Sequence, residues 1–357
     1  MKIAPLNSWL PLTAEPLVIS GPCGAESLDQ LIATAKGLKA LNKISLFRAG
    51  VWKPRTRPNA FEGKGEEALK WLNEIKKEFG FKITVEVANA QHTELALKYD
   101  IDVLWIGART TVNPFSVQEI ADVLKGVDVP VMVKNPIHAD LQLWIGALER
   151  INNSGITKLA AIHRGFHVYG KTKYRNKPMW QLPIELRTLF PELPIICDPS
   201  HISGNKELIH SVSQKALDLG MNGLMIESHF NPAIALSDAE QQLTPVQLGE
   251  LISKLILRKE VCTEEAVNKL SELRNIIDEI DEELINTLKK RTQIIEEIGN
   301  YKKEHNITIF QLERWQELLR TRIQLAQKLG LSPNHVEKIC QLLHEESIRI
   351  QNDLMNK

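Results

Sequence analysis

The chain contains few cysteines, and their spacing does not form a disulfide framework. They form no CxxC pair and are too few to staple a small secreted fold, so we expect a reducing, cytoplasmic setting. No apolar run reaches 18 residues, and Pro5, Pro11 and Pro16 interrupt the N-terminus before a signal-peptide core could form. We therefore expect neither secretion nor a membrane span. The four cysteines stand at positions 23, 197, 262 and 340.

The chain also lacks an excess of charge of either sign. Forty-four basic residues balance 44 acidic ones, which leaves no net field to attract nucleic acid or a membrane surface. Any anion must therefore be bound by a local cluster of cations. No GxxxxGK[ST] loop is present, which argues against a nucleotide as that anion.

What the sequence does contain is a regular alternation of strands and helices up to about residue 255. At 357 residues, the chain is long enough for two domains. Eight apolar runs, each followed by a helical pattern at a repeat of roughly 30 residues, favour a (β/α)₈ TIM barrel over an open doubly wound sheet. The eight predicted strands span 16–20, 44–50, 83–87, 102–108, 129–134, 158–164, 193–198 and 222–228.

Beyond residue 263 the pattern changes to helices alone. Apolar residues at steps of three, four and seven predict one helix of about 40 residues, roughly 60 Å long, followed by helices around 311–329 and 333–355. A helix that long cannot bury its apolar stripe within about 90 residues, so we expect a partner chain and at least a dimer. The predicted organisation is a barrel domain at 1–256, a linker at 257–263 and an all-α domain at 264–357.

The carboxyl ends of the barrel strands should carry the chemistry, because active sites of this fold lie at that face. Six cations fall there, and so many like charges in one place call for anions such as phosphate or carboxylate. A set of solvated surface charges is the alternative for any single residue. The six are Arg48, Lys53, Arg55, Arg109, Lys134 and Arg164, with Glu86 among them.

Cys23, in the stretch GPCGAES, raises a separate question. It could be packed in the core, or act as a nucleophile with His201 as its base. Glu227 and Asp238 stand at the same face, however, and one thiolate, one imidazole and two carboxylates suit a divalent transition ion better. The set would accept Mn²⁺, Fe²⁺, Co²⁺ or Zn²⁺.

The motifs at these strand ends together resemble one enzyme family. GPCGAES, FRAGVWKPRT, IGAR, VMVK, HRG, CDPSH, GLMIES and ALSDAEQQL, in this order between residues 19 and 243, are similar to 3-deoxy-D-arabino-heptulosonate 7-phosphate (DAHP) synthase of the short type Iβ. The resemblance implies a metal-dependent (β/α)₈ enzyme that condenses phosphoenolpyruvate with erythrose 4-phosphate. The KPRT stretch separates it from octulosonate 8-phosphate synthases, which carry an asparagine-containing motif there.

The resemblance also assigns roles to residues. It implies metal ligands at Cys23, His201, Glu227 and Asp238. It implies that Glu86 lies near the attacking water, and that Arg55 and Thr56 bind the phosphate of erythrose 4-phosphate. Catalytic roles fall on Lys53, Glu86 and His201. Phosphoenolpyruvate would be held by Arg48, Lys53, Arg109, Lys134 and Arg164.

The helical tail resembles a second family, the all-helical AroQ chorismate mutases, through LRNIIDEIDEELINTLKKR and EEIGNYK. The resemblance implies that arginines hold the two carboxylates of chorismate or prephenate, while Lys302 and Gln351 bond the ether oxygen during rearrangement. Trp315 and Gln311 depart from the glutamate and aspartate usual at these positions. The binding residues implied are Arg274, Arg291, Lys302, Arg314, Ser347 and Gln351.

Helix geometry adds an expectation of its own. Arg274 lies 17 residues, or about 25 Å, before Arg291 on one straight helix, so a single small dicarboxylate cannot contact both. Arg274 should therefore reach into a site of the partner chain. Two hypotheses follow for the tail: a second active site that also regulates the barrel, or a dimerising module that only senses chorismate or prephenate.

Overall fold

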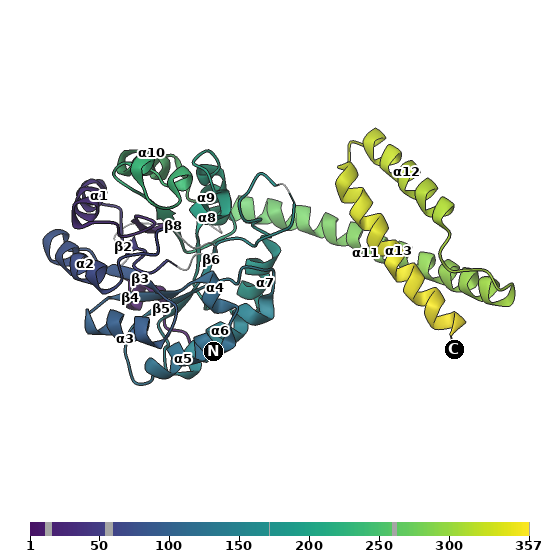
Figure 1. Ribbon diagram of the computed structural model, residues 1–357. Helices are drawn as coiled ribbons and strands as arrows, with labels where there is room; N and C mark the ends of the chain where they lie inside the picture. Colours follow the sequence, from purple (N-terminus) through teal and green to yellow (C-terminus); the bar gives the residue numbers. More distant parts are fainter. Residues whose placement is uncertain (11–15, 54–59, 171, 259–262, 357) are drawn as a thin grey trace. The chain divides into compact units, whose positions relative to one another are not determined.

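The computed structural model describes residues 1–10, 16–53, 60–170, 172–258 and 263–356. The chain divides into two compact units, Met1–Arg258 and Lys259–Lys357 (Figure 1). Each unit has its own architecture.

The first unit is a closed barrel of eight parallel strands in sequence order, with β1 paired to β8. The predicted fold class is thereby confirmed. Each observed strand lies within or at the edge of a predicted run. The strands are β1 Leu17–Gly21, β2 Leu46–Ala49, β3 Ile83–Val87, β4 Val103–Ile106, β5 Val131–Lys134, β6 Leu159–His163, β7 Ile195–Cys197 and β8 Gly223–Glu227.

Helices surround the barrel, and several begin at side-chain caps (Figure 1). Ser27 caps α1 and Asp140 caps α6, while Thr244 forms a capping box with Gln247 at α10. The α-helices are α1 Leu28–Leu41, α2 Glu66–Phe79, α3 Ala90–Lys98, α4 Ala108–Thr111, α5 Pro114–Val123, α6 Leu141–Asn153, α7 Gln181–Leu189, α8 Pro199–Ser203, α9 Ile209–Asp218 and α10 Pro245–Lys254. Short 3₁₀ helices are η1 Leu6–Ser8, η2 Pro232–Ile234 and η3 Ala239–Gln241.

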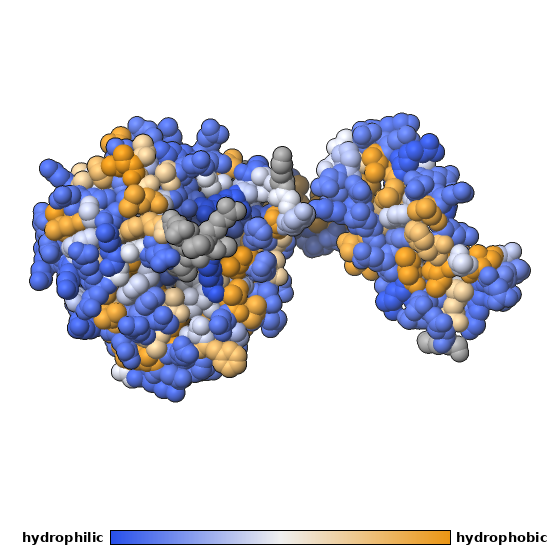
Figure 2. Space-filling view, viewed as in Figure 1, coloured by the Kyte–Doolittle hydropathy of each residue, from blue (hydrophilic) through white to orange (hydrophobic). Residues whose placement is uncertain are grey.

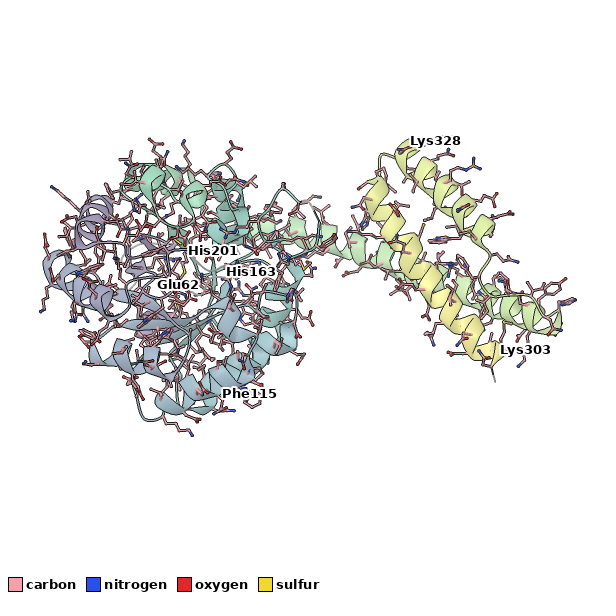
Figure 3. The ribbon with its side chains drawn as sticks, in the orientation of Figure 1. Glu62, Phe115, His163, His201, Lys303 and Lys328 are labelled. Carbon is pink, nitrogen blue, oxygen red and sulfur yellow. The ribbon has the colours of Figure 1, made fainter. Side chains whose placement is uncertain are left out.

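The barrel has two apolar layers because side chains alternate along each strand. In β1, Leu17 and Ile19 join the inner cluster, whereas Val18 packs in the larger cluster between strands and helices. Trp9 and Leu10, next to η1, also belong to the inner cluster. Figure 3 shows His163 and His201 inside this unit and Phe115 at its outer edge.

Two glycines allow functional groups to approach the backbone closely. A Cβ atom at Gly50 would lie 2.3 Å from the carbonyl oxygen of Cys23, and one at Gly107 would lie 2.0 Å from Glu86 Oε1. Real Cβ atoms are not found at such distances, so a larger residue at either position would displace the thiol loop or the carboxylate.

The second unit consists of α11 Glu264–Glu304, α12 Leu312–Lys328 and α13 Pro333–Met355. The prediction of one helix of about 40 residues followed by two shorter ones is confirmed, since α11 contains 41 residues. Apolar residues lie on the surface of this unit (Figure 2). On α11 the exposed ones include Ile276 at 52% and Ile285 at 66%. In the described part of the chain, no helix is long and apolar enough to cross a membrane.

Candidate active site

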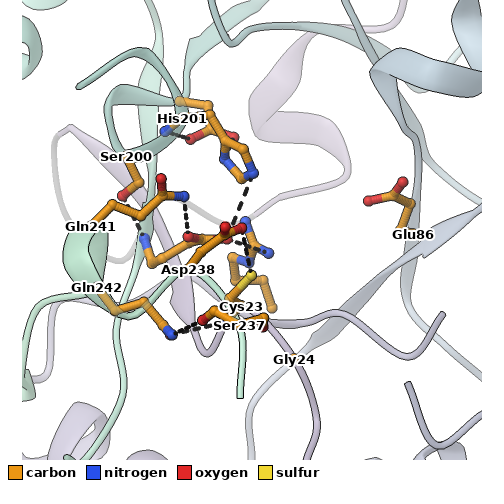
Figure 4. Close-up of polar contacts among 12 residues, drawn as sticks. Cys23, Gly24, Glu86, Ser200, His201, Ser237, Asp238, Gln241 and Gln242 are labelled. Carbon is orange, nitrogen blue, oxygen red and sulfur yellow. Dashed lines mark hydrogen bonds and ion pairs between the residues drawn. The ribbon is translucent and has the colours of Figure 1, made fainter. Parts of the chain in front are cut away.

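The four candidate metal ligands meet at one end of the barrel. Cys23 follows β1 and Glu227 ends β8, the neighbouring strand. His201 lies in α8 after β7, and Asp238 stands between β8 and α10. One donor atom each from Cys23, Glu227 and Asp238 lies within 4.8 Å of the others. His201, labelled with Cys23 and Asp238 in Figure 4, has its Nε2 3.8 Å from Glu227 Oε1 and so adjoins this group.

The Cys23 thiol is buried among charged groups. Its Sγ donates to Asp238 Oδ2 at 3.2 Å and accepts a hydrogen bond from Lys53 Nζ at 2.8 Å. Burial, followed by the charge of Glu227, raises the pKa of this thiol to about 12. The thiolate, not the thiol, is the form that ligates metals, and a bound cation would favour that form. Among the described residues no hydrogen bond joins Cys23 to His201, and the nucleophile alternative gains no support.

Asp198, which directly follows β7 and caps α8, orients His201. Its Oδ2 lies 2.8 Å from His201 Nδ1, and its Oδ1 accepts the backbone N–H of His201. Burial lowers the pKa of His201, which favours the neutral ring. With Nδ1 against Asp198, Nε2 is left facing Glu227. A carboxylate on the far nitrogen is the usual support of a metal-binding histidine.

Glu227 presents one oxygen to the cluster. Gln241 Nε2 donates to its Oε2 at 2.6 Å. Oε1 lies 3.1 Å from Arg48 Nη2, yet it accepts no aligned hydrogen bond within the described residues. Burial opposes ionisation, but His201, when its ring is protonated, and Arg48 hold the pKa of Glu227 below its usual value. A buried carboxylate oxygen beside a thiol, an imidazole and a second carboxylate is a donor set that fits a divalent transition ion.

A polar cavity of about 220 Å³ adjoins the cluster, with His201 in its wall. Three of the predicted cations, Arg109, Lys134 and Arg164, line it. Guanidinium and ammonium groups gathered in this way suit a small ligand with phosphate or carboxylate groups. The lining residues are Glu86, Ala108, Arg109, Lys134, Ile137, Arg164, His167, Arg175, Asn176 and His201.

Arg48, at the end of β2, is the most deeply buried of the predicted cations. Its guanidinium lies 5.0 Å from the centre of the Trp105 ring, and Lys134 Nζ lies 5.8 Å from the same ring. Arg48 Nη2 forms an ion pair with Glu227. The Nε and Nη1 atoms of Arg48 have no hydrogen-bond partner in the described part of the chain. Buried N–H groups normally find an acceptor, so a bound anion would satisfy them.

The remaining barrel residues differ in their settings. Lys53 Nζ also donates to the Cys23 carbonyl, whereas Arg109 is exposed. Burial lowers the pKa of Arg164 to about 10, and its Nη1 donates to Asn176. Glu86 accepts a hydrogen bond from Trp105 Nε1 at 3.1 Å and lies apart from the ligand cluster (Figure 4). The predicted Arg55 and Thr56 fall outside the described residues.

Sequence reasoning missed two charged residues of this site. Arg175 Nη1 contacts Asp238 Oδ1 at 3.0 Å and donates to Gln241, from a loop whose position no strand register indicates. Asp198 was visible in the motif CDPSH, and its place one residue after β7 was the available signal. It pairs with Lys134 at 2.7 Å as well as with His201, which links the cationic cavity to the ligand cluster.

In the helical unit, several of the predicted mutase residues lie close together. Lys302 lines a cavity of about 460 Å³ and donates to the Ile309 carbonyl, while burial lowers its pKa. Ser347 and Gln351 are buried on α13, and Gln351 packs against Gly299 of α11. Burial lowers the pKa of His344, and the nearby charges of Arg291 and Lys302 lower it further.

The other two predicted arginines, Arg274 and Arg314, lie outside this group. Arg314 is exposed and donates to Glu317 on its own helix. Arg274 is exposed near the start of α11, and no hydrogen bond or ion pair within the described residues joins it to the rest. Gln311 lines the same cavity as Lys302, and Trp315 stacks on His344 at 4.0 Å.

Comparisons with known proteins agree with both units. Residues 13–263 match the family model described as the DAHP synthetase I family, and residues 273–352 match chorismate mutase type II. Phospho-2-dehydro-3-deoxyheptonate aldolase of Thermotoga maritima is 31% identical over 238 residues, which cover 67% of this chain and 68% of that protein. The 2-dehydro-3-deoxyphosphooctonate aldolase of Helicobacter pylori is 29% identical over 273 residues, 68% of this chain and 95% of its own.

Solved structures give the same relationship. The crystal structure of the Thermotoga maritima DAHP synthase aligns with a TM-score of 0.61 at 30% identity, covering 67% of each chain. A truncated form of that organism's synthase aligns with a TM-score of 0.58 at 28% identity over 67% of this chain and 84% of its own. The resemblance predicted from the motifs is therefore confirmed: the chain belongs to the DAHP synthetase I family and is an enzyme that also carries a chorismate mutase type II domain.

Proposed function

We propose that the barrel condenses phosphoenolpyruvate with erythrose 4-phosphate to give DAHP and inorganic phosphate, and that it needs a divalent metal ion. The observation that carries this proposal is the ligand cluster of Cys23, His201, Glu227 and Asp238 next to a cavity lined by cations. An electrophile site beside an anion site is what this condensation requires. When bound, the ion would act as a Lewis acid on the sugar aldehyde.

The side chains of the barrel bind and orient the two anionic substrates. Lys134, Arg164 and Arg109 hold the phosphate and carboxylate of phosphoenolpyruvate, and Arg48 offers its unpaired N–H groups to the same ligand. C3 of phosphoenolpyruvate then attacks the aldehyde carbon, which leaves positive character at C2. Glu86, held by Trp105, orients the water that adds to C2 before phosphate departs.

Phosphate release with both substrates tests this proposal directly. We expect turnover that a chelator abolishes and that added Mn²⁺ or Zn²⁺ restores. Full turnover by rigorously metal-free protein would contradict the metal dependence, and no turnover with any divalent ion would contradict the reaction.

A second candidate for the sugar substrate follows from the octulosonate relative. An eight-carbon product requires a five-carbon sugar phosphate, because phosphoenolpyruvate contributes three carbons. The KPRT stretch, residues 53–56, supports the four-carbon substrate instead. We expect kcat/KM to be higher for erythrose 4-phosphate than for a pentose 5-phosphate, and the reverse order would favour the second candidate.

We further propose that the helical unit rearranges chorismate to prephenate. The half-buried Lys302 and the buried Gln351, on facing helices, support stabilisation of the developing charge on the ether oxygen. The exposed apolar stripe of α11 and the separation of Arg274 from the other binding residues support a dimer with shared sites.

A reducing cytoplasm suits the free thiols at Cys23, Cys197 and Cys340.

We also expect the helical unit to regulate the synthase activity of the barrel. A ligand that binds one arrangement of a dimer better shifts the equilibrium toward it. We expect chorismate or prephenate to inhibit the synthase, and removal of residues 264–357 to abolish this inhibition. Inhibition that persists in the isolated barrel would contradict the regulatory role. Prephenate binding without any chorismate conversion by the intact chain would leave only a sensor.

A further inference from the structure

Two adjacent glutamines, Gln241 and Gln242, lie between the candidate metal ligands without belonging to them. Both are almost fully buried, at 1% and 0% exposure. Primary amides buried to this degree must use both their oxygen and their nitrogen in hydrogen bonds, or leave a costly unsatisfied group. Two of their four partners belong to candidate ligands, Cys23 and Glu227, and the other two, Ser237 and Arg175, adjoin Asp238.

Gln242 joins the loops that carry the first and the last ligand. Its Oε1 accepts the backbone N–H of Cys23 at 2.9 Å, and its Nε2 donates to the carbonyl of Ser237 at 2.9 Å. Ser237 directly precedes Asp238. Since one partner is a donor and the other an acceptor, only this orientation of the amide satisfies both. Gln242 therefore sets the distance between the Cys23 and Asp238 loops.

Gln241 acts on the two carboxylates. Its Nε2 donates to Glu227 Oε2 at 2.6 Å, and its Oε1 accepts from Arg175 Nη1 at 2.7 Å. Arg175 Nη1 in turn contacts Asp238 Oδ1 at 3.0 Å. Each carboxylate thus has one oxygen held away from the centre of the cluster. The other oxygens face it: Glu227 Oε1 toward His201 and Asp238 Oδ2 toward Cys23.

We propose that Gln241 and Gln242 are positioning residues that present one oxygen of each carboxylate, together with the Cys23 thiol, to the metal ion. The inference rests on the proposed metal dependence and names the groups that build the site. Outer partners of this kind typically change metal affinity by roughly 10- to 100-fold when they are removed.

Near-isosteric Gln→Glu variants replace the amide donor with a carboxylate, which also adds a charge, so methionine variants that remove the donor without adding a charge are measured beside them. In Gln242→Glu, a carboxylate oxygen would face the Ser237 carbonyl, and in Gln241→Glu one would face Glu227 Oε2. The matched control is Gln91→Glu, at an exposed position on α3. Full-length protein is stripped of metal, and its dissociation constant for Zn²⁺ is measured by competition with a chromogenic chelator.

We expect each variant to bind Zn²⁺ about 10- to 100-fold more weakly than wild type, and the control to be unchanged. Zn²⁺ should also protect Cys23 from alkylation, read at the peptide level by mass spectrometry, less well in the variants. Excess Zn²⁺ should restore kcat. Denaturant unfolding of the same preparations reports whether the barrel has folded. If a glutamate variant fails to fold, the methionine variant at the same position, Gln241→Met or Gln242→Met, replaces it.

The outcomes separate this inference from the proposed function. Wild-type protein that binds Zn²⁺ with Cys23 protected, alongside variants that bind it equally well, overturns the role of the glutamines alone. Wild-type protein in which Zn²⁺ neither binds nor protects Cys23 overturns the metal dependence as well. Weaker binding in the variants with an unchanged control supports both.

Discussion

The barrel and the helical unit differ in which side chains they bury and which they expose. In the barrel, Arg48 and Lys134 are almost completely buried and paired with Glu227 and Asp198. In the helical unit, the ion pairs are exposed and α11 presents a stripe of exposed apolar residues. A site that buries its own charges can be complete within one chain, whereas the exposed apolar stripe of α11 supports the proposed dimer. The comparison predicts where single substitutions will be most damaging.

The largest effect should come from a ligand of the barrel cluster. Cys23→Ser should lower synthase activity by more than the roughly 100-fold upper range for outer partners, because in the proposed site the thiolate itself would contact the ion. Chorismate conversion should be unaffected. Phosphate release and chorismate absorbance, measured on one preparation, give both numbers. Cys340→Ser, on α13, is the control; equal synthase activity in the two variants would contradict the assignment of Cys23.

A second large effect is expected on stability. Asp198→Asn leaves the buried Lys134 ammonium without its counter-charge, and breaking a buried pair in this way typically costs about 3–5 kcal/mol. Denaturant unfolding of the barrel measures it. Glu272→Gln removes the exposed partner of Lys269 on α11 and should leave stability within error. A comparable loss from both variants would break the contrast between the two units.

The pH dependence of the barrel should report a buried histidine. Burial lowers the pKa of His163 to about 3, whereas the unfolded chain titrates near 6.5. Between these values the unfolded state binds the extra proton, so stability is complete above pH 6.5 and falls as the pH decreases. At pH 5 the loss is about 2 kcal/mol, from 1.36 kcal/mol per pH unit.

Substitution provides the check on this histidine. His163→Phe should flatten the change in unfolding free energy between pH 7.5 and pH 5, while His210→Gln, at an exposed position, should not. An unchanged slope in His163→Phe would show that other groups control the acid sensitivity of the barrel.

The smallest expected signal tests the shared sites of the helical unit. Arg274→Ala and Arg291→Ala proteins should each be nearly inactive as mutases. In a two-fold dimer with shared sites, mixing gives half mixed dimers, each with one of its two sites intact. Activity should therefore recover to about one quarter of wild type after subunit exchange. No recovery in verified mixed dimers would mean that each chain builds its own site.

The sequence predicted most of the barrel site because strand register brings residues at strand ends to one face. Cys23, Arg48, Lys134 and Glu227 were predicted on that basis alone, before any contact was known. Arg175 was not, because it lies in a long loop between β6 and α7 whose path depends on tertiary packing. The hydrogen bonds of Gln241 and Gln242 could not be predicted either, because they depend on how separate loops pack, and the one between Gln242 and Cys23 joins residues 219 apart.

The pairing of β1 with β8 has a consequence for how the protein is made. Cys23 emerges early from the ribosome, but its contact Asp238 follows 215 residues later. At about 5–20 residues per second, the nascent thiol waits roughly 10–40 s before the last strand can close over it. During that interval neither burial nor a bound cation shields the sulfur from oxidants. A chain of this design therefore depends, during each round of synthesis, on the thiol-reducing capacity of the cell around it.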